Sequence, residues 1–131
     1  MLRTLRHQIL AIAWSAIILV LCNLPAEDLP QNSPLFFEGF DKLVHTGFFF
    51  VLSVLLFYGK IRQQQSYQYR FLTIIKIFLI SAALGAAIEL MQWKWFTYRS
   101  ADWLDFFCDL LGVAMGTFSY VFLHRIQFNE K

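Results

Sequence analysis

The amino-acid sequence predicts an all-α protein, a bundle of four transmembrane helices with both termini in the cytoplasm. The first observation behind this prediction is the composition. Of 131 residues, 58% are hydrophobic and only 15% are charged, whereas soluble domains carry roughly 25% charged residues. A soluble fold of this length has no interior large enough to bury so much apolar surface. The composition therefore indicates a single membrane domain over residues 1–131.

The second observation is a set of four apolar segments, separated by polar or proline-containing connections. They cover residues 9–24, 43–58, 71–93 and 103–123. A helix needs about 20 apolar residues to cross a hydrocarbon core about 30 Å thick, so the first two segments are short. The first follows two arginines, as the apolar part of a secretory signal does. No small-residue cleavage site comes after it, so we expect it to remain as a span.

The third observation is the distribution of Lys and Arg. With the N-terminus inside, three of them fall on the outer side and eight on the inner side, namely Arg3, Arg6, Lys60, Arg62, Arg70, Lys76, Arg125 and Lys131. Because short cytoplasmic loops are enriched in Lys and Arg, both termini are expected in the cytoplasm. The same topology leaves only Glu130, of nine carboxylates, on the inner side.

The second segment begins with polar residues in the stretch FDKLVHTG. Asp41 and His45 are spaced i, i+4, and Lys42 and His45 are spaced i, i+3, so a helix places all three on one side. Asp41 as a helix cap and Lys42 as a headgroup anchor are the plainer interpretations. His45 lies deeper, and it is either a structural histidine or part of a site.

The third segment ends with Glu89 and Gln92 one helical turn apart. An ionisable group at the middle of a membrane helix costs about 2.5 to 3.5 kcal/mol, so we expect Glu89 to have a partner or a polar cavity. A structural interhelical hydrogen bond is the alternative. The residues before it form a surface on which another helix can approach closely, namely Ala82, Ala83, Gly85, Ala86 and Ala87.

The fourth segment carries three carboxylates on one helical face, Asp102, Asp105 and Asp109. Gly112 and Gly116 continue that face in a GxxxG spacing, which is typical of tight packing between membrane helices. Three acids in an apolar helix need counter-charges, a bound cation or protonation. Lys42, His45 and Arg99 are the candidate partners, since all three are expected at the same membrane face.

Two further features limit the functional classes. A net charge of +2 without a basic run argues against a nucleic-acid partner. Cys22 and Cys108 belong to no paired or metal-binding motif, so we expect small buried hydrophobes, with a disulfide between them as the alternative.

The order and spacing of these residues resemble the VanZ-like family of small bacterial membrane proteins. The resemblance covers about residues 36–120 and rests on Asp41-Lys42-x-x-His45, Glu89-x-x-Gln92, Arg99, and Asp105-x-x-x-Asp109-x-x-Gly112-x-x-x-Gly116. The family commonly has Asn at the position of Asp109, so this chain adds a carboxylate there. The resemblance implies a multi-pass protein of the bacterial inner membrane, associated with tolerance of glycopeptide antibiotics such as teicoplanin. It names no reaction.

The first functional hypothesis is an outward-facing pocket of the cell envelope that binds a lipid headgroup or the phosphate of a lipid-linked precursor. Lys42 and Arg99 would supply positive charge, because Arg and Lys are the common phosphate-binding side chains. Asp102, Asp105 and Glu89 would orient these cations or bind amino and hydroxyl groups of the ligand. Gln92 and Asp109 are the remaining ligand-binding candidates. Aromatic residues at the outer interface would contact the acyl or prenyl chain.

Two alternatives remain open. In an enzyme acting on a phosphorylated lipid, His45 would be a general base or nucleophile oriented by Asp41 or Glu89, and Asp105 with Asp109 would hold Mg²⁺ or Ca²⁺. In a structural subunit, the polar residues would satisfy one another as a buried network. A homodimer is compatible with each hypothesis.

Overall fold

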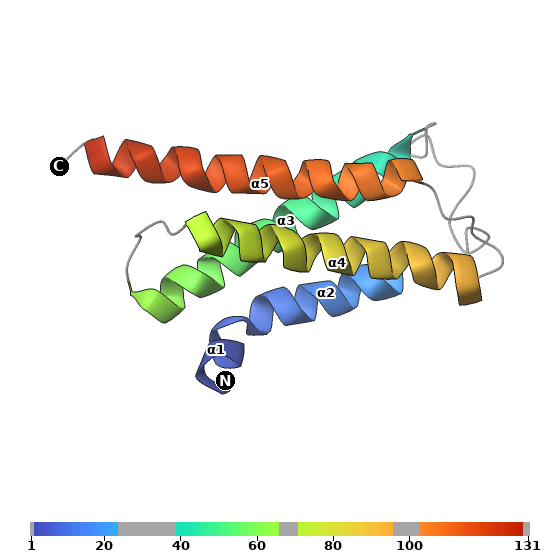
Figure 1. The fold of residues 1–131 in the computed structure, drawn as a ribbon, viewed down its shortest axis with the longest axis horizontal. Coiled ribbons are helices and arrows are strands. Elements are labelled where there is room, and N and C mark those ends of the chain that lie inside the picture. Colours follow the sequence, from blue (N-terminus) through green and yellow to red (C-terminus); the bar gives the residue numbers. More distant parts are fainter. Residues whose placement is uncertain (1, 24–38, 66–70, 96–102, 130–131) are drawn as a thin grey trace.

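The structure is a computed structural model that describes residues 2–23, 39–65, 71–95 and 103–129. These ranges form five helices and contain no strand: α1 (Leu2–His7), α2 (Ile9–Cys22), α3 (Phe40–Gln64), α4 (Phe71–Trp95) and α5 (Trp103–Asn129) (Figure 1). The prediction of an all-α protein is confirmed.

Three of the helices are long and apolar enough to cross a membrane. The stretches that meet this criterion are Phe40–Gln64, Phe71–Lys94 and Trp103–Phe122. The remaining apolar helix, α2, has 14 residues and a length of about 21 Å at 1.5 Å per residue. A bundle of apolar helices is therefore confirmed, with the first predicted span as its shortest member.

Several helix boundaries differ from the apolar segments of the sequence, including the end of α5 at Asn129 rather than at residue 123. The first segment is preceded by α1, and the two helices meet at Gln8. Helix α3 extends beyond the predicted residues 43–58 and ends at Gln64, where Gln65 adopts a left-handed conformation and donates its N–H to the carbonyl of Ile61. Hydropathy marks the part of a helix that can lie in lipid, so it misses a polar turn that continues the same helix.

The helices alternate in direction along the bundle. Figure 1 shows the beginning of α2, the end of α3, the beginning of α4 and the end of α5 at one end of the molecule. The opposite end holds the end of α2, the beginning of α3, the end of α4 and the beginning of α5. The beginning of α2 and the end of α5 thus lie at the same end of the molecule, as the predicted topology requires. Which end faces the cytoplasm stays a prediction.

The most extensive helix contact joins α3 and α5, and two glycines of α5 permit it. A Cβ atom on Gly112 would clash with the backbone oxygen of Thr46, and one on Gly116 would clash with Oγ of Ser53. Only a residue without a side chain lets the two backbones approach this closely. The tight packing predicted from the GxxxG spacing is confirmed.

The interior and the outside of the bundle are both apolar. Ile18, Phe49, Ile88 and Val113 are fully buried and come from four different helices. Large apolar side chains are exposed on the outside as well, including Phe71, Leu79, Phe107 and Phe118. Exposed apolar side chains on this outside surface suit a surface that contacts acyl chains.

Candidate functional site

The polar residues singled out in the sequence meet where α3 and α5 begin. We call Asp41, Lys42, His45, Asp105 and Asp109 the polar cluster. Asp41 lies in the first turn of α3, and Asp105 lies in the first turn of α5. Because the two helices start at the same end of the bundle (Figure 1), residues more than 60 positions apart in the chain become neighbours.

The deepest contact of the polar cluster joins His45 and Asp109. Their Nδ1 and Oδ1 atoms are 2.9 Å apart, and the two side chains are 1% and 0% exposed. The Cys22 side chain of α2 is a further close neighbour of His45. His45 therefore has a defined orientation, which distinguishes it from a histidine that merely fills space.

Nearer the end of the bundle, Lys42 faces Asp105. Lys42 Nζ lies 3.6 Å from Asp105 Oδ1, and the side chains are 37% and 8% exposed. At this distance the contact is an ion pair rather than a short hydrogen bond. Asp105 is directed toward α3 rather than toward lipid, so the expected neutralisation by a basic residue of another segment is confirmed for this carboxylate.

Three members of the polar cluster come close enough to share a ligand. One donor atom each from Asp41, His45 and Asp105 lie within 4.8 Å of one another. Asp109, which was predicted to hold a metal together with Asp105, directs Oδ1 at His45 instead. The arrangement suits a cation held by Asp41, His45 and Asp105, with Asp109 behind the imidazole.

The second oxygen of Asp109 lies against α4. A Cβ atom on Gly85 would be 2.7 Å from Asp109 Oδ2, so the small-residue surface predicted on this helix receives a carboxylate of α5. Within the described ranges, Oδ2 accepts no hydrogen bond. The absence of a side chain at Gly85 therefore leaves room for the Asp109 carboxylate. The sequence alone did not identify this role.

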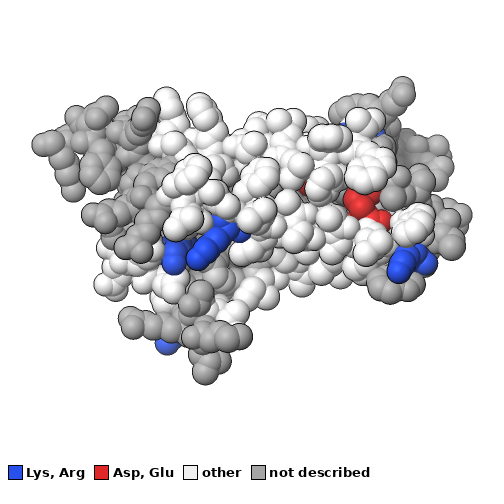
Figure 2. All heavy atoms as spheres, in the orientation of Figure 1, with Lys and Arg blue, Asp and Glu red and all other residues white. Residues whose placement is uncertain are grey.

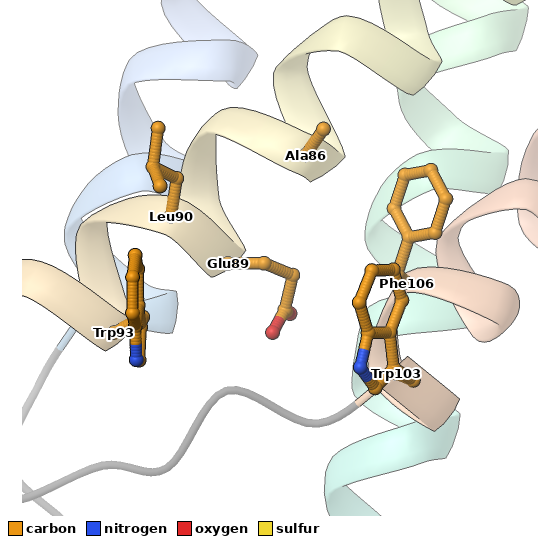
Figure 3. A pocket seen from close by; sticks show the side chains of 6 residues that line it. All are labelled: Ala86, Glu89, Leu90, Trp93, Trp103 and Phe106. Atoms are coloured by element: carbon orange, nitrogen blue, oxygen red, sulfur yellow. The ribbon is translucent and has the colours of Figure 1, made fainter.

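Gln92 and Glu89 take different positions on α4. Gln92 is buried, and its Nε2 donates to the backbone oxygen of Cys22 at 2.8 Å. This bond caps the end of α2 with a side chain of α4. Glu89 instead points into a cavity of about 650 Å³ (Figure 3). The other described residues that line this cavity are apolar or aromatic, so they do not provide the polar cavity that was expected for Glu89.

The cavity has mainly apolar walls. Besides Glu89 it is lined by Ala86, Leu90 and Trp93 of α4 and by Trp103 and Phe106 of α5, and Figure 3 shows the Glu89 carboxylate between the two tryptophans. Phe106 also comes within 3.4 Å of the Cβ position of Gly85, the residue in contact with Asp109. The cavity and the polar cluster are therefore neighbours.

The surface view agrees with this placement. On the face shown in Figure 2, the visible carboxylates lie toward one end of the molecule, which Figure 1 identifies as the end where α4 finishes and α5 begins.

Two further candidates from the sequence, Arg99 and Asp102, lie outside the described residues. Cys22 and Cys108 are free thiols, so the alternative of a disulfide between them is not realised in this structure.

Some neighbours of the site were not among the candidates. Cys22 lies beside His45, and Phe106 lines the cavity. Phe106 follows Asp105 directly in the sequence. This adjacency was the only sequence feature that could have indicated that Phe106 lies near the site. Cys22 carried no such signal, because its place depends on how α2 packs against α3.

One of three comparisons with known proteins gave a match. Searches of curated proteins and of solved structures gave no significant match. The profile of the VanZ/LLP1 family matches residues 4–124, a range that includes α2, α3 and α4 completely, most of α1 and α5, and every member of the polar cluster. The chain, with its apolar helices long enough to cross a membrane, therefore belongs to the VanZ/LLP1 family.

Proposed function

We propose that the protein binds the phosphate-bearing headgroup of a membrane lipid, or of a lipid-linked precursor of the cell envelope, at the outer end of the bundle. The observation that carries this proposal is the cavity of about 650 Å³ beside the polar cluster. Ligand pockets are typically concave, mostly apolar and supplied with a few convergent polar groups. A cavity with aromatic walls and one carboxylate, adjoining a lysine and further carboxylates, has that character.

The two parts of the site suit the two parts of a lipid. Trp93, Trp103 and Phe106 provide flat apolar surface for a prenyl or acyl chain. Lys42 is 37% exposed, so its ammonium group can reach a phosphate in exchange for Asp105. Glu89 accepts hydrogen bonds from hydroxyl or amino groups. A ligand with a charged head and an apolar chain would use both parts.

Binding can be measured with a short isoprenoid pyrophosphate added to the purified protein in detergent. Trp93 and Trp103 line the cavity, so occupation should quench tryptophan fluorescence in a saturable way. Lys42→Gln should weaken binding about tenfold, because a hydrogen bond to a charged group is worth about 1.5 kcal/mol or more. Trp103→Phe should reduce the amplitude of the quench.

Lys76→Gln is the matched control, since Lys76 is an exposed lysine of α4 that does not line the cavity. It should bind as the unmodified protein does. Absence of saturable quenching, or equal weakening by Lys42→Gln and Lys76→Gln, would contradict the proposed site. Labelling of single cysteines at positions 31 and 97 from outside and at position 64 from inside tests its orientation.

A second candidate function is metal-assisted chemistry on a phosphorylated lipid, and the geometry of His45 favours it. Metal-binding histidines usually donate a hydrogen bond from the N–H of their other ring nitrogen, often to a carboxylate, and this bond fixes the ring. Asp109 is such a carboxylate, at 2.9 Å from Nδ1. Asp41 and Asp105 would supply the oxygen ligands. A metal held there would polarise a phosphoryl oxygen or activate a water molecule.

The ligand types also indicate which metal to test. Mg²⁺ and Ca²⁺ prefer oxygen ligands, whereas imidazole together with carboxylates suits Zn²⁺ or Mn²⁺. Calorimetry with each of the four ions should give the tightest binding for Zn²⁺ or Mn²⁺ and a clear loss in Asp41→Asn and Asp105→Asn. Release of phosphate from an isoprenoid pyrophosphate in the presence of the bound ion would establish turnover.

These measurements separate the functional proposals from a purely structural role. Metal binding without turnover would leave a binding protein, and lipid binding without metal would remove the enzyme hypothesis. If Asp41→Asn, Lys42→Gln, Glu89→Gln and Asp105→Asn all lower stability to a similar degree and none alters binding, the polar residues only join helices. A contribution to teicoplanin tolerance is tested by comparing the susceptibility of cells that express the protein and its Lys42→Gln variant.

A further inference from the structure

The end of the bundle opposite the polar cluster contains a second hollow of different character. We call it the basic pocket, and its volume is about 480 Å³. It is lined by Arg6 and His7 of α1, Ile9 and Leu10 of α2, and Tyr58 and Arg62 of α3. Cationic side chains and aliphatic side chains thus face the same space, an amphipathic lining that matches neither a purely polar ligand nor a purely apolar one.

The basic pocket is held in place by close contacts between the α1–α2 junction and α3. Gln8 donates from Nε2 to the backbone oxygen of Leu56 at 3.2 Å. A Cβ atom on Gly59 would be 2.5 Å from the backbone oxygen of His7, so the junction lies directly on the backbone of α3. These contacts hold the backbone that carries Arg6 and His7 against the part of α3 that carries Tyr58 and Arg62.

The guanidinium group of Arg62 is positioned by an aromatic ring. Its Cζ atom lies 5.9 Å from the centroid of Tyr58, within the range of a cation–π contact. Arg62 and Arg6 are both exposed, so their donor groups remain accessible. Each guanidinium group presents the planar fork of N–H donors that recognises phosphate bidentately, so two phosphate-binding groups are available at this pocket.

No carboxylate competes for these arginines in the part of the chain that the structure describes. The Asp and Glu residues of the described ranges are Asp41, Glu89, Asp105 and Asp109, and these belong to the polar cluster or to the cavity beside it. Charge complementarity at the basic pocket therefore favours an anionic ligand. Its position next to exposed Ile9 and Leu10 places that anion at the edge of an apolar surface.

We propose that the basic pocket binds the phosphodiester headgroup of an anionic phospholipid, with Arg6 and Arg62 on the phosphate and Ile9 and Leu10 against the upper part of an acyl chain. Basic pockets between membrane helices on the cytoplasmic side are suited to anionic headgroups. The predicted topology puts this end on the cytoplasmic side, where anionic lipids would be available to it. The bound lipid would lie between α1 and α3, far from the polar cluster.

The test is a titration of the purified protein in detergent with short-chain phosphatidylglycerol and, in parallel, with short-chain phosphatidylcholine. Phosphatidylglycerol should bind more tightly. Arg6→Gln and Arg62→Gln should each weaken its binding about fivefold, the effect expected for one basic residue near an anionic lipid. Arg62→Lys, which keeps the charge and loses the planar fork, should lie between Arg62→Gln and the unmodified protein.

Lys76→Gln removes the same charge from an exposed position that does not line the basic pocket, and it should leave binding unchanged. An equal loss in Lys76→Gln would mean that only general surface charge attracts the lipid, and the proposal would fail. Equal affinity for the two lipids would also overturn it. Glycerol phosphate without acyl chains should compete poorly, and strong competition by it would remove the role of Ile9 and Leu10.

Discussion

The α3–α5 interface consists of two adjoining parts that hold the helices together by different means. At the beginning of both helices, polar side chains meet in pairs, Lys42 with Asp105 and His45 with Asp109. One to two turns further along α5, Gly112 and Gly116 let the backbones touch. The first part depends on directional contacts between charged or polar groups, and the second depends on the absence of side chains.

The difference between the polar part and the glycine part indicates which of them is structural and which is available for function. In lipid, helix association relies on close packing and interhelical hydrogen bonds rather than on a hydrophobic driving force. The glycines meet that requirement without any polar group. The polar part is costly to insert, and the packing of small residues does not need it. The glycines therefore serve as the scaffold that sets the distance across the polar cluster.

The largest expected effect comes from separating His45 and Asp109. His45→Leu leaves the carboxylate of Asp109 buried without its partner, and loss of one member of a buried pair costs about 3 kcal/mol. Asp109→Leu should have an effect of similar size. The double variant should be destabilised by clearly less than the sum, as measured by unfolding in detergent. Additive effects would mean that the two groups do not interact.

The glycine part is tested by Gly112→Ala. The added methyl group meets the backbone of Thr46, which has no flexible end that can move away, and overpacking of this kind costs about 2 kcal/mol. Gly47→Ala is the matched control, because a Cβ atom there meets nothing within 4 Å. Since Ala favours a helix more than Gly does, Gly47→Ala should be neutral or slightly stabilising. Equal destabilisation of both variants would contradict the close approach of α5 to α3.

A smaller loss is expected for Gly116→Ala. Its nearest obstacle is the Oγ atom of Ser53, a side-chain atom that can rotate away, and the backbone oxygen of Phe50 is second at 2.9 Å. We expect a cost of about 1 kcal/mol. Because Ser53→Ala removes the obstructing oxygen, the double variant Gly116→Ala/Ser53→Ala should recover most of the stability. The melting temperatures of the three variants provide the measurement.

The smallest effect on stability is expected for Lys42→Met. An ion pair whose lysine is 37% exposed contributes less than about 1 kcal/mol, so the unfolding transition should hardly move. Binding of an isoprenoid pyrophosphate should nevertheless weaken. A large destabilisation with unchanged binding would reverse the assignment, since Lys42 would then belong to the scaffold rather than to the site.

Most of the fold was predictable from the sequence because hydropathy decides which segments enter lipid. Helices α3, α4 and α5 each contain the corresponding predicted segment for this reason. The break at Gln8 was not predicted, because it depends on a hydrogen bond to Leu56, a residue 48 positions away. Local sequence contains no information about such a contact.

The site was predictable in part, and the limit has a geometric cause. Spacing along a single helix shows that Asp105 and Asp109 share a face, and it also shows that Lys42 and His45 share another. It does not show which acid meets which base, because that depends on the register between α3 and α5. The register is fixed where Gly112 meets Thr46. The contact of Asp109 with Gly85 depends in the same way on α4.

The antiparallel order of the helices also determines the electric field at the polar cluster. The N-termini of α3 and α5, each with a carboxylate in its first turn, present the positive ends of their helix dipoles there. The end of α2 beside His45 and the end of α4, with Lys94 in its last turn, present negative ends. Asp41 and Asp105 in these first turns and Lys94 in the last turn of α4 thus each face a dipole end of opposite sign, which stabilises the charged form of each side chain.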